Sequence, residues 1–404
     1  MSRLPLSHIR VLELGTAIAS PYATSLLADA GAEVVKIETE RRPDNLRHNF
    51  PMLDGVGGVN RSFYFNIINR NKLGLTIDLL HPEGRAHFLK LVGISDVVIE
   101  NFAAGTMERM GVPYGELRKA NPGIIHVSLS GFGATGPTRN YVAYGPLLES
   151  VAGFAMLGGY EGGPPSNSAF VYTDYVSALY GAMLALSGLA RRQETGQGAY
   201  FDVSQAEVTF NAIPDAFLQY AVNGSIPKKK ENRDEFIPVH GVYHCKGLEQ
   251  WVTLGARTEE EWAALCKALG DPAWAQRPEF ATPASRVAHQ AELNKLIEAW
   301  TRRHTPQEAT DILQQHGVAS APVYNIQQVY EDPHLRERGM WQDIVHPVIG
   351  RRPGYASPAF IHGASREIRK AAPLWAEDNT RIYAELLGMS PADITRLTEA
   401  KALV

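Results

Sequence analysis

Cysteine is nearly absent from this sequence, which has only Cys245 and Cys266 in 404 residues. Two cysteines are too few for a disulfide framework or for a zinc site with four cysteine ligands. We therefore expect a reducing, cytoplasmic compartment. The sequence also has no apolar run near the roughly 20 residues that span a bilayer, and its first residues, 1–5, lack the apolar core of a secretion signal. These features predict no membrane association.

An excess of basic charge is also missing. The formal net charge is −4, the pI is about 6.4, and no long basic stripe occurs. Because proteins that bind nucleic acids usually carry such a stripe, we expect no nucleic-acid partner. The content of 45% apolar and 20% charged residues is ordinary for a globular protein, and the length allows two or three domains.

Several motifs that define common enzyme sites are missing too. The sequence has no G-x-x-x-x-G-K-[ST] phosphate loop and no G-x-S-x-G nucleophile turn. Its thirteen histidines form no H-E-x-x-H motif and no close cluster with cysteine, so we expect no metal site. The segment after the first predicted strand, 15–20, lacks G-x-G-x-x-G, which argues against a typical dinucleotide site.

Alternating strand-like and helical segments predict an α/β fold with a parallel, Rossmann-like sheet. The first unit consists of a strand at 10–14, a helix at 22–30 that follows the Ser20-Pro21 pair, and a strand at 33–37. Further strands are predicted at 75–78, 96–100 and 124–129. Polar residues follow the strand ends, where open α/β sheets bind their ligands.

We predict a domain boundary at the charge run 228–235, which is typical of a solvated linker. The predicted organisation is a Rossmann-like large domain over 1–205, a helix and linker over 206–235, a smaller α+β domain over 236–325 and a return segment over 326–404.

Asp174 is the most prominent candidate functional residue. It precedes an apolar helix whose apolar residues recur at helical spacing, namely Val176, Leu179, Tyr180, Met183, Leu186 and Leu189. This spacing predicts a helix buried around most of its girth, with Asp174 at or near its N-cap. A carboxylate there can simply cap the helix or can act as a nucleophile, and caps are by far the more common. Lys72, Arg47 and Arg109 could bind phosphates as isolated cations, although each residue alone is more typical of a surface charge.

The sequence resembles the family III CoA-transferases, a group that includes formyl-CoA transferase, carnitine CoA-transferase and α-methylacyl-CoA racemase. Each matching motif is short, but together they follow the family's order over nearly the whole chain. The matching segments are 11–14, 31–38, 69–72, 75–79, 96–102, 131–137, 195–198, 201–204, 321–324 and 332–335.

The resemblance implies that Asp174 is the catalytic nucleophile. In this family a carboxylate attacks the thioester to form a mixed anhydride, and the CoA thiolate then forms an aspartyl-CoA thioester. The acceptor acid reverses these steps, so that one difficult acyl exchange becomes several easier ones. CoA is then a substrate, and no permanently bound cofactor is expected. Glycines at 158, 159, 162 and 163 suit a mobile cover that excludes water.

The resemblance also implies binding residues. Lys72, Asn101, Phe102 and Arg109 match positions that hold CoA, and Arg47 matches an arginine in the loop after the second strand. Tyr144 matches a substrate-side tyrosine, whereas Ile18 replaces a glutamine near the active site. His240 is our candidate for recognising a polar acyl chain, with a purely structural role as the alternative. Thr39 replaces an arginine near the adenine, and the segment 238–241 replaces a glycine run, so a formyl or oxalate substrate is not expected.

The function we predict is CoA transfer between small dicarboxylic acids such as mesaconate, succinate, malate or itaconate, between two molecules or within one. A racemase or epimerase is the first alternative, but residues 142–145 offer neither the His nor the Asp that it needs. A non-catalytic CoA-binding subunit is the second, and the presence of Asp174 disfavours it. The resemblance implies an interlocked homodimer, in which both chain ends build each Rossmann-like large domain.

Overall fold

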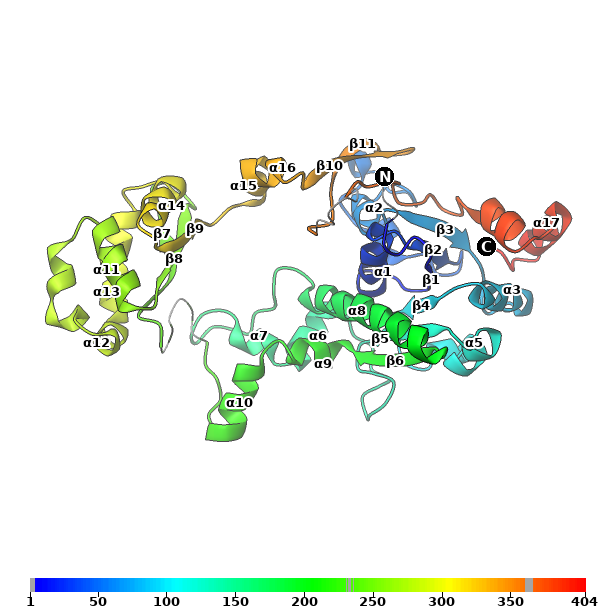
Figure 1. Cartoon of the computed structure of the whole chain (residues 1–404), viewed down its shortest axis with the longest axis horizontal. Helices are drawn as coiled ribbons and strands as arrows, with labels where there is room; N and C mark the ends of the chain where they lie inside the picture. Colours follow the sequence, from blue (N-terminus) through cyan, green and yellow to red (C-terminus); the bar gives the residue numbers. More distant parts are fainter. Residues whose placement is uncertain (1–3, 230, 232–233, 235, 360–365) are drawn as a thin grey trace. The chain divides into compact units, whose positions relative to one another are not determined.

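The computed structural model describes residues 4–229, 231, 234, 236–359 and 366–404, which form two compact units (Figure 1). The first unit comprises residues 1–156, 166–227 and 337–404, and the second comprises 157–165 and 228–336. Four residues of the predicted linker, namely Lys230, Asn232, Arg233 and Glu235, lie outside the described residues, as do residues 1–3 of the N-terminal segment. Both ends of the chain thus contribute to the first unit.

A six-stranded parallel sheet forms the centre of the first unit, in the order β3-β2-β1-β4-β5-β6. The expectation of a parallel α/β sheet is therefore confirmed. The strand order reverses between β1 and β4, and this reversal opens a crevice at the carboxyl ends of these strands. The strands are β1 Arg10–Glu13, β2 Glu33–Glu38, β3 Lys72–Thr76, β4 Val97–Glu100, β5 Ile125–Ser130 and β6 Ala199–Ser204.

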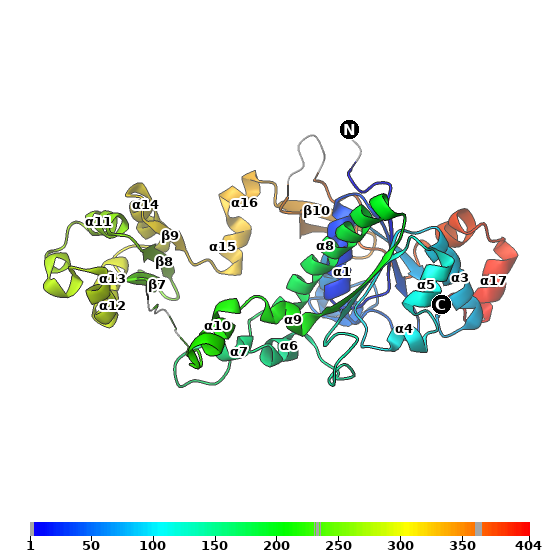
Figure 2. The same ribbon diagram turned by 60° about the horizontal axis from the view of Figure 1, so that its bottom comes forward.

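Helices cover both faces of this sheet. On one face, α1 (Ala19–Asp29) and α8 (Tyr172–Thr195) lie side by side over apolar residues of β1, β4 and β5 (Figures 1 and 2). The other face is covered by α3 (Pro82–Gly93), α5 (Tyr114–Ala120), a π-helical turn (Arg381–Leu386) and α17 (Pro391–Glu399). The C-terminal segment contacts β3, because the Gly74 N–H donates to Asp378 Oδ2 at 2.8 Å and the Thr76 hydroxyl donates to the Leu403 carbonyl.

Shorter elements complete the first unit. These are α2 (Phe63–Ile68), α4 (Thr106–Arg109), α6 (Gly145–Val151), α7 (Phe154–Leu157), α9 (Gln205–Phe210), α10 (Pro214–Asn223) and an antiparallel hairpin of β10 (Trp341–His346) and β11 (Gly350–Tyr355). The predicted single helix after Val203 is in fact two helices, because Pro214 cannot continue the hydrogen-bond ladder of α9.

The second unit packs helices against a three-stranded antiparallel sheet. Its strands are β7 (Val239–His244), β8 (Trp251–Ala256) and β9 (Ala319–Pro322), and its helices are α11 (Glu259–Ala268), α12 (Pro283–Ala288), α13 (Gln290–Thr301) and α14 (Pro306–Gln315). Capping boxes at Thr258 with Glu261 and at Thr305 with Glu308 set the starts of α11 and α14. Two further helices, α15 (Ile326–Glu331) and α16 (Pro333–Glu337), follow β9.

Asp174 lies near the N-cap of its helix, as expected, whereas the start of α1 was predicted slightly wrongly. Helix α8 begins at Tyr172 with Val171 as its N-cap, so Asp174 lies in the first turn. Helix α1 begins at Ala19, so Ser20-Pro21 lies inside it. Small residues decide how α8 packs: a Cβ at Gly181 or Gly188 would lie 2.9 or 2.8 Å from side chains of β5.

The exposed side of α8 also differs from the expectation. Leu179, Met183 and Leu186 are 54%, 50% and 44% exposed, so in this single chain the helix is not buried around most of its girth. The small residues at Ser177, Ala178, Gly181, Ala182 and Ala185 are buried. Val176, Tyr180, Leu184 and Leu189 also pack on the core, so the exposed large apolar residues of α8 form one stripe, Leu179, Met183 and Leu186.

A cluster of buried charged side chains connects three strands of the sheet. Glu13 is fully buried and its carboxylate lies 2.7 Å from both Lys36 Nζ and Lys72 Nζ. Burial alone would raise the pKa of Glu13, but the two ammonium groups outweigh it and lower this pKa to about 2. The carboxylate therefore ties β1, β2 and β3 together as a charged group.

We predict that Glu13→Gln lowers the free energy of unfolding by about 3–5 kcal/mol, because it leaves buried ammonium groups without their shared counter-ion. Chemical denaturation at pH 7 measures this change. Glu33→Gln is the matched control, since Glu33 pairs with Arg10 and Arg381 at a half-exposed position, where a loss of at most about 1 kcal/mol is expected. Equal losses in both variants would contradict the buried-cluster interpretation.

Candidate active site

The Asp174 carboxylate lies where several helices begin. It is largely buried, and the backbone N–H groups of Asp174 itself and of Ala19 donate hydrogen bonds to it. Ala19 is the first residue of α1, and Asp174 is the third residue of α8. Because free N–H groups and the helix dipole favour negative charge at a helix N-terminus, this position supports an ionised carboxylate.

A third helix begins at the same point. Gly145 is the first residue of α6, and a Cβ atom at this position would lie only 2.2 Å from Asp174 Oδ2. Any larger residue would displace the carboxylate or the helix. Glycine at 145 therefore lets the backbone of α6 approach the carboxylate closely.

The pKa of Asp174 is raised to about 6. Burial is the main cause and the nearby negative charge of Glu149 adds to it, whereas the backbone N–H groups act in the opposite direction. A carboxyl group with this pKa is still ionised at neutral pH, yet it is more basic than an exposed aspartate. Such tuning is typical of catalytic groups.

Tyrosine side chains form a wall beside Asp174. The rings of Tyr22 and Tyr175 pack edge to face with centroids 4.9 Å apart, and the hydroxyl oxygens of Tyr64 and Tyr175 are 3.2 Å apart. Burial raises the pKa of both Tyr64 and Tyr175, and the Asp174 charge contributes to each increase. These hydroxyls therefore stay protonated and available as hydrogen-bond donors near the carboxylate.

The three predicted substrate-binding residues lie in different surroundings. Ile18 is buried and belongs to an apolar cluster that also contacts Val171 and Tyr175, so it lies near the start of α8. Tyr144 is 63% exposed and directly precedes Gly145. His240 is an exposed residue of β7 in the second unit.

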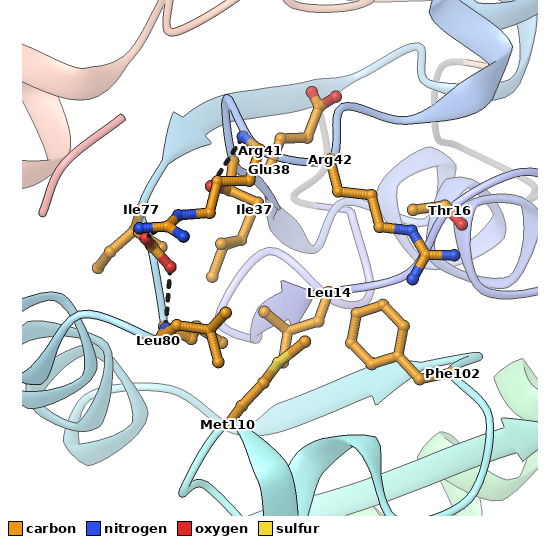
Figure 3. Close-up of a pocket in the computed structure, with 13 residues that line it drawn as sticks. Leu14, Thr16, Ile37, Glu38, Arg41, Arg42, Ile77, Leu80, Phe102 and Met110 are labelled. Carbon is orange, nitrogen blue, oxygen red and sulfur yellow. Dashed lines mark hydrogen bonds and ion pairs between the residues drawn. The ribbon is translucent and has the colours of Figure 1, made fainter. Parts of the chain in front are cut away.

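A cavity of about 220 Å³ lies at the carboxyl ends of β1, β2, β3 and β4 (Figure 3). Its apolar lining suits a flat aromatic ring, and two arginines stand at its rim. Leu14, Ile37, Leu79, Phe102 and Met110 contribute apolar surface, together with the polar or charged residues Thr16, Thr39, Arg41 and Arg42. Arg41 forms an ion pair with Asp78 at 2.7 Å, whereas the Arg42 side chain extends toward Phe102 and Thr16.

The two rim arginines were not identified from the sequence. Arg41 and Arg42 follow the second strand closely, at the sheet edge where ligands bind, and this placement was the available signal. A pair of adjacent arginines in a polar loop carries no motif of its own, so only the cavity distinguishes these two from other surface cations.

The predicted CoA-binding residues separate into two groups. Phe102 lines the cavity, and Arg109 is exposed beside the cavity residue Met110 and donates to the Thr106 hydroxyl at 2.7 Å. Asn101 shapes the loop after β1: its Oδ1 accepts from the Thr16 N–H at 2.9 Å, and its Nδ2 donates to the Thr16 carbonyl at 2.8 Å. These three residues surround one region at the end of β4.

Arg47 and Lys72 form the other group and are fully buried. Arg47 donates to both carboxylate oxygens of Glu38, at 2.6–3.1 Å, and lies 3.8 Å from the centre of the Phe65 ring. Lys72 donates to Glu13, to the Pro21 carbonyl and to Asn69 Oδ1. Neither residue lines the cavity, and protein groups hold both charges.

The part of the chain that the structure describes contains no helix long and apolar enough to cross a bilayer. Over the same residues, no three His, Cys, Asp or Glu side chains gather in a way that could hold a metal ion.

Comparisons with known proteins identify the family of this chain. The sequence model of CoA-transferase family III matches residues 6–379. A Mycobacterium tuberculosis protein named as a probable CoA-transferase is 34% identical over 411 residues, which cover 99% of this chain. Because they cover only 50% of the Mycobacterium protein, this chain spans about half the length of that relative.

Two further matches extend over nearly the whole of both proteins. The succinyl-CoA–D-citramalate CoA-transferase of Chloroflexus aurantiacus is 31% identical over 404 residues, covering 99% of this chain and 98% of the relative. The crystal structure of a CaiB/BaiF family protein from Brucella suis superposes with a TM-score of 0.84 at 28% identity, covering 95% of this chain and 100% of that one. The resemblance inferred from the sequence motifs is thus confirmed, and this chain belongs to CoA-transferase family III.

Proposed function

We propose that this protein transfers CoA from an acyl-CoA thioester to a small dicarboxylic acid, with Asp174 as the nucleophile. The observation that supports this most strongly is the buried carboxylate at the starts of α1, α6 and α8, with its pKa raised to about 6.

The proposed reaction begins with attack of Asp174 on the thioester carbonyl. The tetrahedral oxyanion collapses, the C–S bond breaks, and CoA leaves as a thiolate from a mixed anhydride between Asp174 and the acyl group. The thiolate then attacks the aspartyl carbonyl of the anhydride, which releases the first acid and leaves an aspartyl-CoA thioester. The acceptor carboxylate repeats both steps in reverse and regenerates Asp174.

Backbone N–H groups at the helix starts support these steps. Each tetrahedral intermediate carries a negative oxygen, and preorganised N–H donors can stabilise an oxygen of this kind. The Ala19 N–H already contacts the carboxylate, and α6 begins against its Oδ2 atom. Exclusion of water by the tyrosine wall protects the anhydride from hydrolysis.

We further propose that the cavity in Figure 3 holds the nucleotide part of CoA. Thr16 lines this cavity and Ala19 contacts Asp174, so three peptide units, or at most about 11 Å of chain, connect the two places. The flexible pantetheine arm of CoA would run along this segment. Phe102 and Met110 would pack on the adenine, and Arg42 and Arg109 would bind phosphates.

The dicarboxylate class of substrate is supported by the relative that acts with succinyl-CoA and D-citramalate. Both compounds carry a second carboxylate beyond the reacting one. Tyr144, which precedes the glycine that touches Asp174, is our candidate for contacting the substrate, and Ile18 would contact its carbon chain. His240, which belongs to the other unit, stays a sequence-based candidate for recognising a polar acyl chain. The close fit at Gly145 leaves no room there for the base that a racemase requires.

A homodimer is the assembly that we propose. The exposed apolar stripe of Leu179, Met183 and Leu186 on α8 would be covered by a second copy of this chain. The interlocked arrangement implied by the family resemblance accounts for a helix that is apolar around most of its girth.

We expect Asp174→Asn to abolish CoA transfer, because the amide is nearly isosteric but is a poor nucleophile. Incubation of the wild-type enzyme with acyl-CoA alone, followed by borohydride or hydroxylamine trapping and peptide mass spectrometry, should place the modification on Asp174. Solvent deuterium should not enter the α-position of the acyl group. Exchange at that position without an adduct would instead support a racemase.

We expect kcat/KM to rise with pH through about 6 and to level off above it, because Asp174 must be ionised to attack. A rate that does not change between pH 5 and 8 would contradict the assignment of Asp174 as the nucleophile.

The raised pKa of Asp174 also changes how the free energy of unfolding depends on pH. The folded protein retains a proton on Asp174 between about pH 4 and 6 that the unfolded chain, with an ordinary aspartate pKa of about 3.9, has lost. Stability therefore falls as the pH rises through this window, so Asp174→Asn should raise the unfolding temperature at pH 8 and not at pH 4.

We expect Arg109→Ala and Phe102→Ala to raise the KM for acyl-CoA with little change in kcat at saturation. Loss of one charge-assisted phosphate contact, about 1.5–3 kcal/mol, corresponds to roughly a 10- to 100-fold change for Arg109. Steady-state kinetics at low and high salt measure it, and Arg118→Ala, another exposed arginine that contacts Gln197, is the control. A lower kcat with an unchanged KM would place these residues elsewhere in the mechanism.

A further inference from the structure

Glu149 is a fully buried carboxylate one helical turn after Gly145 on α6. None of the ion pairs among the described residues involves it. Its oxygens instead accept three hydrogen bonds from the segment that leads into α8. The Tyr172 N–H donates to Oε1 at 3.1 Å, the Ser168 hydroxyl donates to Oε1 at 2.7 Å, and the Ser168 N–H donates to Oε2 at 2.9 Å.

A buried charge in this position requires a reason, because desolvating a carboxylate is costly without compensation. The three donors supply that compensation, and one of them is the Tyr172 N–H, the first N–H of α8, which is shared between Glu149 and the Phe170 carbonyl at 2.9 Å. The anion therefore satisfies the helix start that carries Asp174. It also binds Ser168, six residues before the nucleophile, and so fixes the path of the chain into α8.

Helix α6 thus contacts the start of α8, which carries Asp174, in two places. Residues four apart lie on the same side of a helix, and here Gly145 touches the Asp174 carboxylate while Glu149 holds the backbone two residues before it. A shift of the Glu149 contacts would move the Asp174 carboxylate relative to the Ala19 N–H.

We propose that Glu149 is the positioning residue for Asp174, which it holds in the attacking geometry through Tyr172 and Ser168 without touching the substrate. This inference rests on the proposed nucleophilic role of Asp174. The negative charge of Glu149 has a second effect, because it faces the Asp174 carboxylate and favours its protonated form. The other groups that face Asp174 are Tyr64 from α2, Tyr175 from α8 and the Ala19 N–H from α1.

Two substitutions separate the positional effect from the charge effect. Glu149→Ala removes all three contacts and should lower kcat about 100-fold, the loss typical of a misplaced catalytic group, with little change in the KM for acyl-CoA. Glu149→Gln keeps the two contacts of Oε1, with the Tyr172 N–H and the Ser168 hydroxyl, but removes the charge and the contact of Oε2 with the Ser168 N–H. Its kcat should fall much less, and the acidic limb of its pH–rate profile should move to lower pH.

A control variant distinguishes positioning from a general loss of stability. Leu397 is fully buried on α17, which covers the other face of the sheet, so Leu397→Ala should lower the unfolding temperature by an amount comparable to Glu149→Ala. Assayed below its unfolding temperature, Leu397→Ala should keep the wild-type kcat and pH profile.

The measurement is the rate of adduct formation on Asp174 with acyl-CoA alone, together with kcat and KM between pH 5 and 8. If the wild-type enzyme forms no adduct, the proposed function fails. If the wild-type enzyme forms the adduct and Glu149→Ala forms it equally fast, the positioning role fails while the proposed function stands. A loss of kcat in Leu397→Ala that matches that of Glu149→Ala would likewise reduce Glu149 to a stabilising residue.

Discussion

The meeting of three helix N-termini at one buried carboxylate is the constraint on which the rest of this structure depends. A desolvated aspartate is unstable as an anion unless donors surround it, and here the first turns of α1 and α8 supply backbone N–H donors while α6 begins against the carboxylate. The balance between burial and N–H donors leaves Asp174 ionised at neutral pH but more basic than usual. Glycine at 145 is necessary because a Cβ would occupy the position of the carboxylate oxygen.

Buried charged side chains on the sheet hold the loop that leads into α1, one of the three helices that begin at Asp174. Lys36 Nζ contacts Glu13 and the Gly15 carbonyl, and Asp44 accepts from the Ala17 N–H, so the loop that leads into α1 is held by groups on β2 and on the segment after β2. Asn101 holds the same loop from the end of β4. The cavity and the nucleophile are thus joined by a short segment that is anchored from both sides of the strand-order reversal.

Much of the large unit could be predicted from the sequence. Buried strands at 10–14, 33–37, 96–100 and 124–129 lie within about one residue of those observed, because apolar runs bounded by turn residues are local signals. The strand predicted at 75–78 was displaced, since β3 spans Lys72–Thr76. The basic side chain of Lys72 resembles a loop residue in the sequence, and its partner Glu13 lies 59 positions away.

The candidate site was predictable in part, because short sequence motifs are also local signals. The collinear motifs identified family III from the sequence, and this resemblance, rather than the pre-helix segment alone, made Asp174 the predicted nucleophile. Only the tertiary structure shows that Lys72 and Arg47 are buried against carboxylates. The cavity with Arg41 and Arg42 at its rim is likewise visible only in the folded chain. Local sequence determines which segments form strands and helices and which residue types they carry. Whether a charge faces a ligand or a buried partner depends on contacts between residues far apart in the chain, and only the folded arrangement brings those residues together.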